Sequence, residues 1–243
     1  MSKPLQGRTL KAYMPAKNII KEYEPNGYYH VYNRGVEKRD IFLDQQDYKV
    51  FISYLKLYLS PPNLQGNLQG RTLKDDNDHT IPPSRANSNF VDEIFLYAYC
   101  LMPNHFHFLI KQVSERSMEN FMRSIMTKYV MYFNKRYHRV GSLFQGKYKT
   151  VRILSEDQYT YITKYIHRNP LTGHPTGSDL EGLREYKYSS YGNYLGLFKQ
   201  SWVNTDDILT YFSKTNPRNS YQSFVEETGD IAKVYKEMID LDE

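Results

Sequence analysis

Apolar residues recur with two different periods along the first third of the chain, and each period predicts a different element. Aromatic and β-branched residues alternate from Gly27 and stop at Asn33-Arg34-Gly35, which predicts a strand, a turn and a short second extended piece. Residues 44–59 instead carry apolar side chains at helical spacing, and Asp44 stands where an N-cap is expected. This part of the chain therefore predicts a strand followed by an amphipathic helix.

The pattern downstream of residue 92 predicts a hairpin. Residues 93–102 are almost continuously apolar, Pro103-Asn104 turns the chain, and residues 105–111 alternate between two faces. A continuous apolar run bounded by a turn is typical of a buried strand, and the alternating segment is its antiparallel partner.

Two further helices and one strand follow. Apolar side chains at helical spacing predict a long helix over residues 117–137, and residues 141–154 predict a loop and a strand. Ser155 and Gln158 have the spacing of a capping box, which begins another helix. This helix must end near Asn169, because Pro170 disfavours helical geometry in the residue before it.

The order strand, helix, strand, strand, helix, strand, helix predicts an α+β fold. Its first six elements match the ferredoxin-like split βαβ pattern, in which a four-stranded antiparallel sheet carries two helices on one face. The seventh element is an extra C-terminal helix. Many unrelated functions use this fold, so the fold alone identifies none of them.

The chain divides into a polar N-terminal arm (1–26), a main domain (27–200) and a helical C-terminal appendage (201–243). Residues 60–91 are rich in Pro, Asn, Gly, Asp and Ser and are expected to form a flexible insertion. The heptapeptide LQGRTLK occurs twice, at 5–11 and at 68–74. It has no obvious chemistry, so a captured repetitive DNA segment explains it better than a motif used twice.

Composition narrows the classes of protein that fit. The net charge is +5, and 24 tyrosines and 12 phenylalanines accompany the basic residues. Basic charge mixed with aromatic rings suits a surface that neutralises phosphates and stacks unpaired bases. Cys100 is the one cysteine, so no disulfide forms within the chain. We find neither a signal-peptide pattern nor an 18-residue apolar run, and we expect a cytoplasmic protein without a membrane segment.

The segment MPNHFHFLI contains the most informative chemistry. Along a strand His105 and His107 project to the same face, about 6.6 Å apart, while Phe106 and Phe108 project into a core. Two imidazoles on one face suit a divalent metal, although two surface histidines are the simpler interpretation of the pattern taken alone.

The last predicted helix brings a second polar set. Residues four apart share a helical face, so Tyr161, Tyr165 and Asn169 line up. A phenol and an amide on one face can meet the two histidines. Tyrosine is a weak nucleophile near neutral pH, because its ordinary pKa is about 10, and it needs a polarised electrophile or help with its proton.

A basic segment without carboxylates predicts a nucleic-acid surface. No acidic residue lies between Glu119 and Glu156. The basic residues there are Arg123, Lys128, Lys135, Arg136, Arg139, Lys147, Lys149 and Arg152, and Arg34 and Lys38 extend the set. A charge run is usually only a solvated face, but its place beside the histidine strand favours a DNA track.

Several motifs together resemble a known family. MPNHFHFLI, GSLFQGKYK and YIHRNP, with YHVYNRG near the start and REYKYSSYGNYLG at 184–196, are similar to the single-tyrosine HUH transposases, in particular the REP-associated tyrosine transposases. The similarity covers roughly residues 27–200, and it is specific as a set rather than motif by motif.

The resemblance implies roles for individual residues. His105 and His107 would hold Mg²⁺ or Mn²⁺, and Asn169 would complete the protein ligands, at a position where the wider group often has Gln. Imidazole ligands favour Mn²⁺ in vitro and cellular abundance favours Mg²⁺. Tyr165 would attack single-stranded or hairpin DNA to give a 5′-phosphotyrosine and a free 3′-OH, with Tyr161 as the reserve nucleophile. The implied activity is DNA nicking and strand transfer at hairpin or palindromic repeat DNA.

Two other functions remain open at this point. A non-catalytic nucleic-acid-binding protein could keep the fold and the basic track, and a metal-dependent phosphodiesterase could use water in place of Tyr165. The resemblance also leaves the oligomeric state open. Insertion-sequence relatives imply swapped dimers, whereas the repeat-associated branch implies monomers, which we favour.

Overall fold

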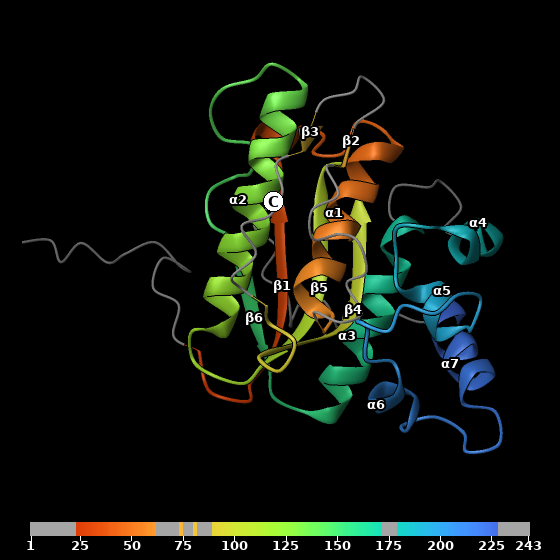
Figure 1. Ribbon diagram of the computed structural model, residues 1–243. Helices are drawn as coiled ribbons and strands as arrows, with labels where there is room; N and C mark the ends of the chain where they lie inside the picture. Colours follow the sequence, from red (N-terminus) through yellow and green to blue (C-terminus); the bar gives the residue numbers. More distant parts are fainter. Residues whose placement is uncertain (1–22, 62–72, 75–79, 82–88, 172–178, 228–243) are drawn as a thin grey trace, which may run out of the picture.

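A computed structural model of the protein describes residues 23–61, 73–74, 80–81, 89–171 and 179–227. Its centre is a four-stranded sheet in the order β4-β5-β1-β6, in which every neighbouring pair is antiparallel (Figure 1). The strands are β1 (Tyr28–Arg34), β4 (Ile94–Met102), β5 (His105–Gln112) and β6 (Lys149–Ile153). The predicted α+β ferredoxin-like sheet is confirmed.

The prediction of a second extended piece after the first strand is wrong. β1 is followed by a 3-10 turn, η1 (Val36–Lys38), in which Glu37 and Lys38 have positive φ angles of 57° and 61°. The chain then enters α1 (Gln45–Leu59), and the Asp44 carboxylate accepts hydrogen bonds from two backbone amides of its first turn. Asp44 is therefore the N-cap that the sequence predicts.

The remaining elements follow the predicted order. β4 and β5 form the hairpin, and a bulge between Leu96 and Ala98 changes which β4 side chains face each layer. The helices are α2 (Ser117–Arg136) and α3 (Glu156–Arg168), and a 3-10 turn, η4 (Asn169–Leu171), follows α3. The Ser155 hydroxyl caps α3 by accepting from the Gln158 amide.

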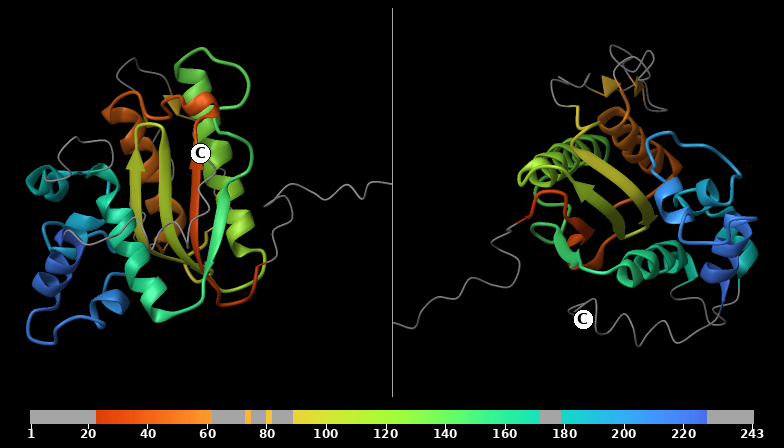
Figure 2. Two further views of the ribbon diagram at one scale, coloured as in Figure 1. Left: turned by 180° about the vertical axis from the view of Figure 1, so that it is seen from behind. Right: turned by 90° about the horizontal axis from the view of Figure 1, so that it is seen from below.

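The two faces of the sheet bury different helices. α1 and α2 cover one face, where Val31, Phe106 and Phe108 join the larger core. α3 lies on the other face and packs against Leu109 and other residues of a second core (Figure 2). Since strand side chains alternate, the histidine face of β5 is the face that α3 covers.

One buried carboxylate joins α1 to α2. Asp47 is fully buried and accepts hydrogen bonds from the hydroxyls of Tyr132 and Tyr137 at 2.9 and 2.8 Å. It also pairs with Arg136 at 3.1 Å and caps the Leu43 amide at 2.8 Å. A buried charge tolerates burial only with such partners, so this cluster fixes how the two helices pack.

The C-terminal residues form small helices that extend the α3 layer. They are α4 (Leu180–Glu185), α5 (Tyr191–Tyr194), α6 (Asp206–Leu209) and α7 (Pro217–Glu226). α7 contacts α3 through a Tyr221 hydroxyl that lies 2.6 Å from Nδ1 of the buried His167. Trp202 and Leu209 are also buried, so residues of the predicted appendage pack against the main domain.

Two predicted segments fall mostly outside the described residues. Of the N-terminal arm, residues 23–26 are described, and the Tyr23 hydroxyl donates to that of Tyr148 at 3.0 Å. Of the insertion, β2 (Leu73–Lys74) and β3 (Thr80–Ile81) form an antiparallel pair. None of the helices in the described ranges has the length and hydropathy that a bilayer crossing requires.

Candidate active site

Side chains from β5 and α3 converge on the face of the sheet that α3 covers. His105 and His107 project from β5, and their ring centroids are 5.0 Å apart. Tyr165 and Asn169 project from one side of α3, where their four-residue spacing places them a turn apart. The structure thus brings together the four residues that the sequence predicts for the catalytic site.

His105 lies between two amide oxygens. Its Nε2 is 2.9 Å from Oδ1 of Asn169, and its Nδ1 is 2.6 Å from Oδ1 of Asn104. A neutral imidazole carries one N–H, so it can donate to only one of the two oxygens. If Nε2 binds a cation, Nδ1–H donates to Asn104, and the Asn169 oxygen is then available to the same cation.

His107 lies deeper and meets a third histidine. It is 3% exposed, and its Nδ1 is 2.9 Å from Nε2 of His30 on β1. The two rings stack with centroids 5.1 Å apart, and Tyr32 stacks on both of them. His107 is therefore held in one orientation by a hydrogen bond and by ring packing.

Burial keeps the imidazoles neutral. Burial lowers the pKa of His105, and the nearby Arg34 charge lowers it further. Burial also lowers the pKa of His107 well below its ordinary value. Only a neutral imidazole has a lone pair for a metal, so both rings are in the form that ligation requires.

Tyr165 lies directly against the histidines. Its ring meets those of His107 and His30 edge-on, with centroids 5.2 and 5.7 Å apart. Burial raises the pKa of Tyr165 to about 12, and a hydrogen bond with Asn169 opposes this rise. The phenol is therefore protonated near neutral pH and must lose its proton during any attack.

The donor set fits a small hard cation with few protein ligands. Two ligands at adjacent corners of an octahedral Mg²⁺ site lie about 3 Å apart, close to the 2.9 Å between His105 Nε2 and Asn169 Oδ1. Within the described residues no cluster of three or more His, Cys, Asp or Glu could hold a metal. Two imidazoles and one amide oxygen leave the other positions to water and phosphate oxygens, which suits Mg²⁺ and Mn²⁺.

His30 is the site residue that sequence reasoning missed. A signal for it existed, because the alternation that places Tyr28 and Tyr32 on one face of β1 also places His30 there. The cross-strand register was the missing information: Tyr32 pairs with His107 and His30 pairs with Leu109, which brings these side chains to one face.

The reserve nucleophile lies toward the appendage. Tyr161 is 39% exposed, and its ring packs on Phe224 of α7 with centroids 5.5 Å apart. It is one turn before Tyr165 on α3, as expected, but it is the Tyr165 ring that contacts the histidines.

The predicted basic residues separate into groups. Arg34 pairs with His105 across the strands, and Lys149 pairs with Tyr32, so both stand on the histidine face. Lys147 is exposed in the loop beside them, where the Gln145 amide donates to the Arg34 carbonyl. The Arg34 guanidinium also donates to Oε1 of Gln145 at 3.2 Å. These three cations border the site. Lys38 is exposed in η1.

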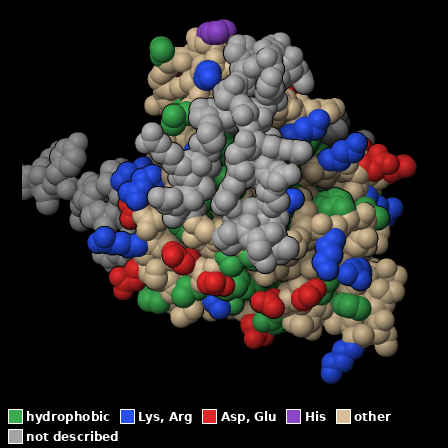
Figure 3. All heavy atoms as spheres, in the orientation of Figure 1, with side chains coloured by type: hydrophobic (Ala, Val, Ile, Leu, Met, Phe, Trp, Pro, Cys, Tyr) green, Lys and Arg blue, Asp and Glu red, His purple; other side chains and the backbone are tan. Residues whose placement is uncertain are grey.

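The other predicted basic residues lie away from the histidines. α2, which carries Arg123, Lys128 and Lys135, covers the opposite face of the sheet, and the residues after it include Arg139. Arg136 is paired with Asp44 and Asp47, and Arg152 is paired with Glu24. In Figure 3, the Lys and Arg side chains that are visible lie at several separate places.

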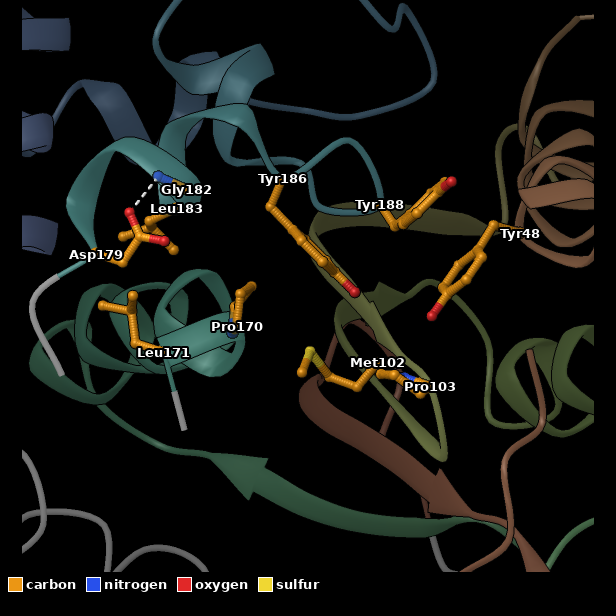
Figure 4. A pocket seen from close by; sticks show the side chains of 10 residues that line it. All are labelled: Tyr48, Met102, Pro103, Pro170, Leu171, Asp179, Gly182, Leu183, Tyr186 and Tyr188. Carbon is orange, nitrogen blue, oxygen red and sulfur yellow. Dashed lines mark hydrogen bonds between the residues drawn. The ribbon is translucent and has the colours of Figure 1, made fainter. Parts of the chain in front are cut away.

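An aromatic pocket of about 310 Å³ borders the site. Met102 and Pro103, just before the histidine strand, and Pro170, just after Asn169, form part of its wall. Figure 4 shows Tyr186 projecting between them and the Tyr48 and Tyr188 side chains. The last two rings stack with centroids 3.7 Å apart. The pocket offers flat aromatic surface, and part of its wall is formed by residues that are close in sequence to the proposed ligands His105 and Asn169.

Comparison with known proteins points to one family. The model of the family described as IS200-like transposases matches residues 87–169. No curated protein matches the chain. One solved structure, titled as a REP-associated tyrosine transposase bound to a REP hairpin, has 13% identity and a TM-score of 0.49, over 77% of this chain and 92% of that one.

The matched segment contains the four residues that the sequence predicts for the catalytic site. It begins before β4 and ends at Asn169, so it includes His105, His107 and Tyr165. The resemblance to single-tyrosine transposases is confirmed for this segment, because residues 87–169 are similar to the IS200-like transposases.

Proposed function

We propose that the protein is a metal-dependent transposase that nicks and rejoins single-stranded DNA through Tyr165. One observation supports this above all others: α3 delivers the Tyr165 ring to within 5.2 Å of the His107 ring, beside the paired His105 and Asn169. A nucleophile beside two imidazoles and an amide oxygen matches the chemistry of phosphoryl transfer assisted by a cation.

Each side chain has a distinct part in the proposed reaction. The Tyr165 oxygen attacks the scissile phosphorus, a Tyr–O–P bond forms, and the bond from phosphorus to the 3′ oxygen breaks. The phenol loses its proton during the attack, and the departing 3′ oxygen takes up a proton to become a 3′-OH. The DNA 5′ phosphate stays on Tyr165, and attack by a 3′-OH later reverses the step without ATP.

His105, His107 and Asn169 would hold the cation, either Mg²⁺ or Mn²⁺. Bound there, it supplies polarisation of a phosphate oxygen and neutralisation of developing charge. The protein residues orient the phosphate against Tyr165 and exclude water from the buried side of the site, where His107 and Asn169 are almost inaccessible.

We propose that DNA passes along the border of the site. Arg34, Lys147 and Lys149 can neutralise phosphates next to the scissile one, and the pocket beside Tyr186 and Tyr188 offers rings on which a base can stack. Arg123, Lys128, Lys135 and Arg139 would contact only DNA that reaches the α2 face of the protein.

A monomer is the form that the site supports. Tyr165 meets the histidines of its own chain, so one copy already contains the full set of proposed groups. A swapped dimer would take the helix from a second copy, and this arrangement needs no such exchange.

The central experiment separates the transposase from its two alternatives. The protein is incubated with labelled single-stranded hairpin DNA and Mn²⁺ or Mg²⁺, with and without EDTA, and resolved on a denaturing gel. We expect a metal-dependent covalent band that Tyr165→Phe abolishes and that Tyr161→Phe retains. Cleavage without a covalent band would indicate a water nucleophile, and binding without cleavage would indicate a non-catalytic protein. An adduct that survives Tyr165→Phe would move the role to another tyrosine.

A further inference from the structure

His30 is a fully buried polar side chain to which the proposed reaction has so far given no role. It stands on β1 at 0% exposure, and its Nε2 lies 2.9 Å from Nδ1 of His107. Among the residues that the structure describes, its own Nδ1 has no hydrogen-bond partner. Burying an imidazole with an unsatisfied nitrogen is costly, so a hydrophobic side chain would suit this core position better if packing were its only role.

The contact between the two rings has two possible arrangements of protons when both rings are neutral. A hydrogen bond between two nitrogens needs a proton on one and a lone pair on the other. Either His107 donates from Nδ1 and keeps its lone pair on Nε2, or His30 donates from Nε2 and His107 is protonated on Nε2.

The first arrangement is the one compatible with a metal ligand. It leaves His107 Nε2 with a lone pair, and it gives His107 the same pattern as His105, whose Nδ1 faces Oδ1 of Asn104 at 2.6 Å. Each proposed ligand then has its own acceptor for Nδ1–H. Partners of this kind fix the tautomer and the ring orientation of metal-binding histidines.

Building on the proposed function, we infer that His30 is a positioning residue that accepts Nδ1–H of His107 and so directs the His107 Nε2 lone pair toward the divalent cation. It does so from a strand that contributes no proposed ligand. Stacking of Tyr32 on both rings holds this pair in plane.

Three substitutions at this position separate the hydrogen bond from packing. His30→Gln places an amide oxygen near the position of Nε2 and can still accept from His107. His30→Asn has the same amide but is one methylene shorter, so it cannot reach. His30→Phe fills the space without an acceptor. Leu109→Met, opposite His30 on β5, is a matched control for the core of this face.

The first readout is Mn²⁺ affinity, titrated on the full chain without DNA. We expect Mn²⁺ to bind about 10- to 100-fold more weakly to His30→Phe and His30→Asn, the usual loss when an outer partner of a ligand is removed. His30→Gln and Leu109→Met should bind close to the natural protein. If Phe prevents folding, the Gln and Asn pair gives the same comparison. Equal affinity in all variants would overturn the inference.

The second readout needs neither metal nor activity. Long-range ¹H–¹⁵N spectra of histidine-labelled protein report which ring nitrogen carries the proton, and His107→Asn identifies the signals of His107. We expect the His107 proton on Nδ1 in the natural protein and in His30→Gln, and a shift toward Nε2 in His30→Phe. A proton on Nε2 in the natural protein would contradict the role of His30.

The two readouts also distinguish this inference from the proposed function. If the natural protein forms no covalent adduct but holds the His107 proton on Nδ1 and binds Mn²⁺ in a manner that depends on His30, the nicking proposal is wrong and the inference stands. If the adduct forms and His30→Phe binds Mn²⁺ as tightly as the natural protein, the nicking proposal stands and the role of His30 is wrong.

Discussion

At the scale of single residues, Asn169 connects the two halves of the site. Its Oδ1 is 2.9 Å from Nε2 of His105, and it opposes the rise that burial causes in the pKa of Tyr165. It stands in a 3-10 turn at the end of α3, where Pro170 ends the helix.

This geometry leads to a prediction for Asn169. Asn169→Leu removes the proposed oxygen ligand and should weaken Mn²⁺ binding by at least about tenfold, since even outer partners of ligands are worth that much. Asn169→Gln keeps the amide on a longer side chain and should retain part of the affinity. The measurement is a Mn²⁺ titration of each variant. Identical affinity in the Leu variant would exclude Asn169 as a ligand.

At the scale of elements, α3 is held between the sheet and the C-terminal helices. Nδ1 of its buried His167 is hydrogen-bonded to the Tyr221 hydroxyl of α7 at 2.6 Å, and Nε2 is hydrogen-bonded to the Ser190 hydroxyl at 2.8 Å. The Lys164 ammonium lies over the Phe224 ring, 4.9 Å from its centroid. The appendage therefore supports the helix that presents Tyr165, rather than acting as an independent arm.

Removing the Tyr221 hydroxyl should show how much its contact with His167 adds to the stability of the fold. Tyr221→Phe leaves the buried His167 Nδ1 without its hydrogen-bond partner, which should lower the free energy of unfolding by about 1–3 kcal/mol. Urea denaturation measures the change. Tyr211→Phe alters an exposed phenol in the same appendage, and we expect a change within about 0.5 kcal/mol. Equal effects of the two substitutions would show that the contact adds no stability.

The pairing of α1 with α2 depends on Asp47 in a similar way. Asp47→Ala removes the acceptor of two tyrosine hydroxyls and one of the two carboxylate partners of the half-buried Arg136, so the free energy of unfolding should fall by about 3–5 kcal/mol. Asp44→Ala removes the exposed N-cap, and its cost should be about 1 kcal/mol. Thermal or chemical unfolding of both variants gives the comparison, and a smaller loss for Asp47→Ala than for Asp44→Ala would contradict this account.

At the scale of the whole molecule, the basic residues that the structure describes are spread over several segments rather than gathered in one track. The part of the chain without carboxylates crosses from the α2 face to the edge strand β6, and two of its arginines are paired with carboxylates. The three cations beside the histidines come from separate segments: Arg34 from β1, Lys147 from a loop and Lys149 from β6. The proposed DNA path therefore follows the end of β1 and the edge of the sheet.

This placement predicts which charges matter for DNA. Arg34→Ala and Lys149→Ala should each weaken binding of single-stranded hairpin DNA and reduce the slope of log affinity against log salt by about one. Arg184→Ala, which removes a cation paired with Glu226, should leave the slope unchanged. Fluorescence anisotropy across a salt series measures both quantities. A slope that is insensitive to Arg34 and Lys149 would move the DNA path elsewhere.

The sequence alone determined the order of the main elements and the alternation that places His105 and His107 on one face of β5. Periodicity and capping are local properties, so Asp44, Ser155 and the His105–His107 alternation could be interpreted from neighbours in the chain. The family motifs contributed Tyr165 and Asn169, and the sheet and both flanking layers follow the predicted pattern. The prediction of an extended piece after Gly35 was wrong. The chain forms a 3-10 turn there, with positive φ angles at Glu37 and Lys38, and no periodic pattern in the sequence indicates such a turn.

Only the tertiary structure decided which distant residues meet. His30 reaches His107 through the register of β1 with β5, and Arg136 reaches Asp47 through helix packing. Contacts of this kind depend on pairings between segments many residues apart, which no local period encodes. For the same reason a basic stretch that is continuous in sequence is divided between opposite faces of the sheet once the chain has folded.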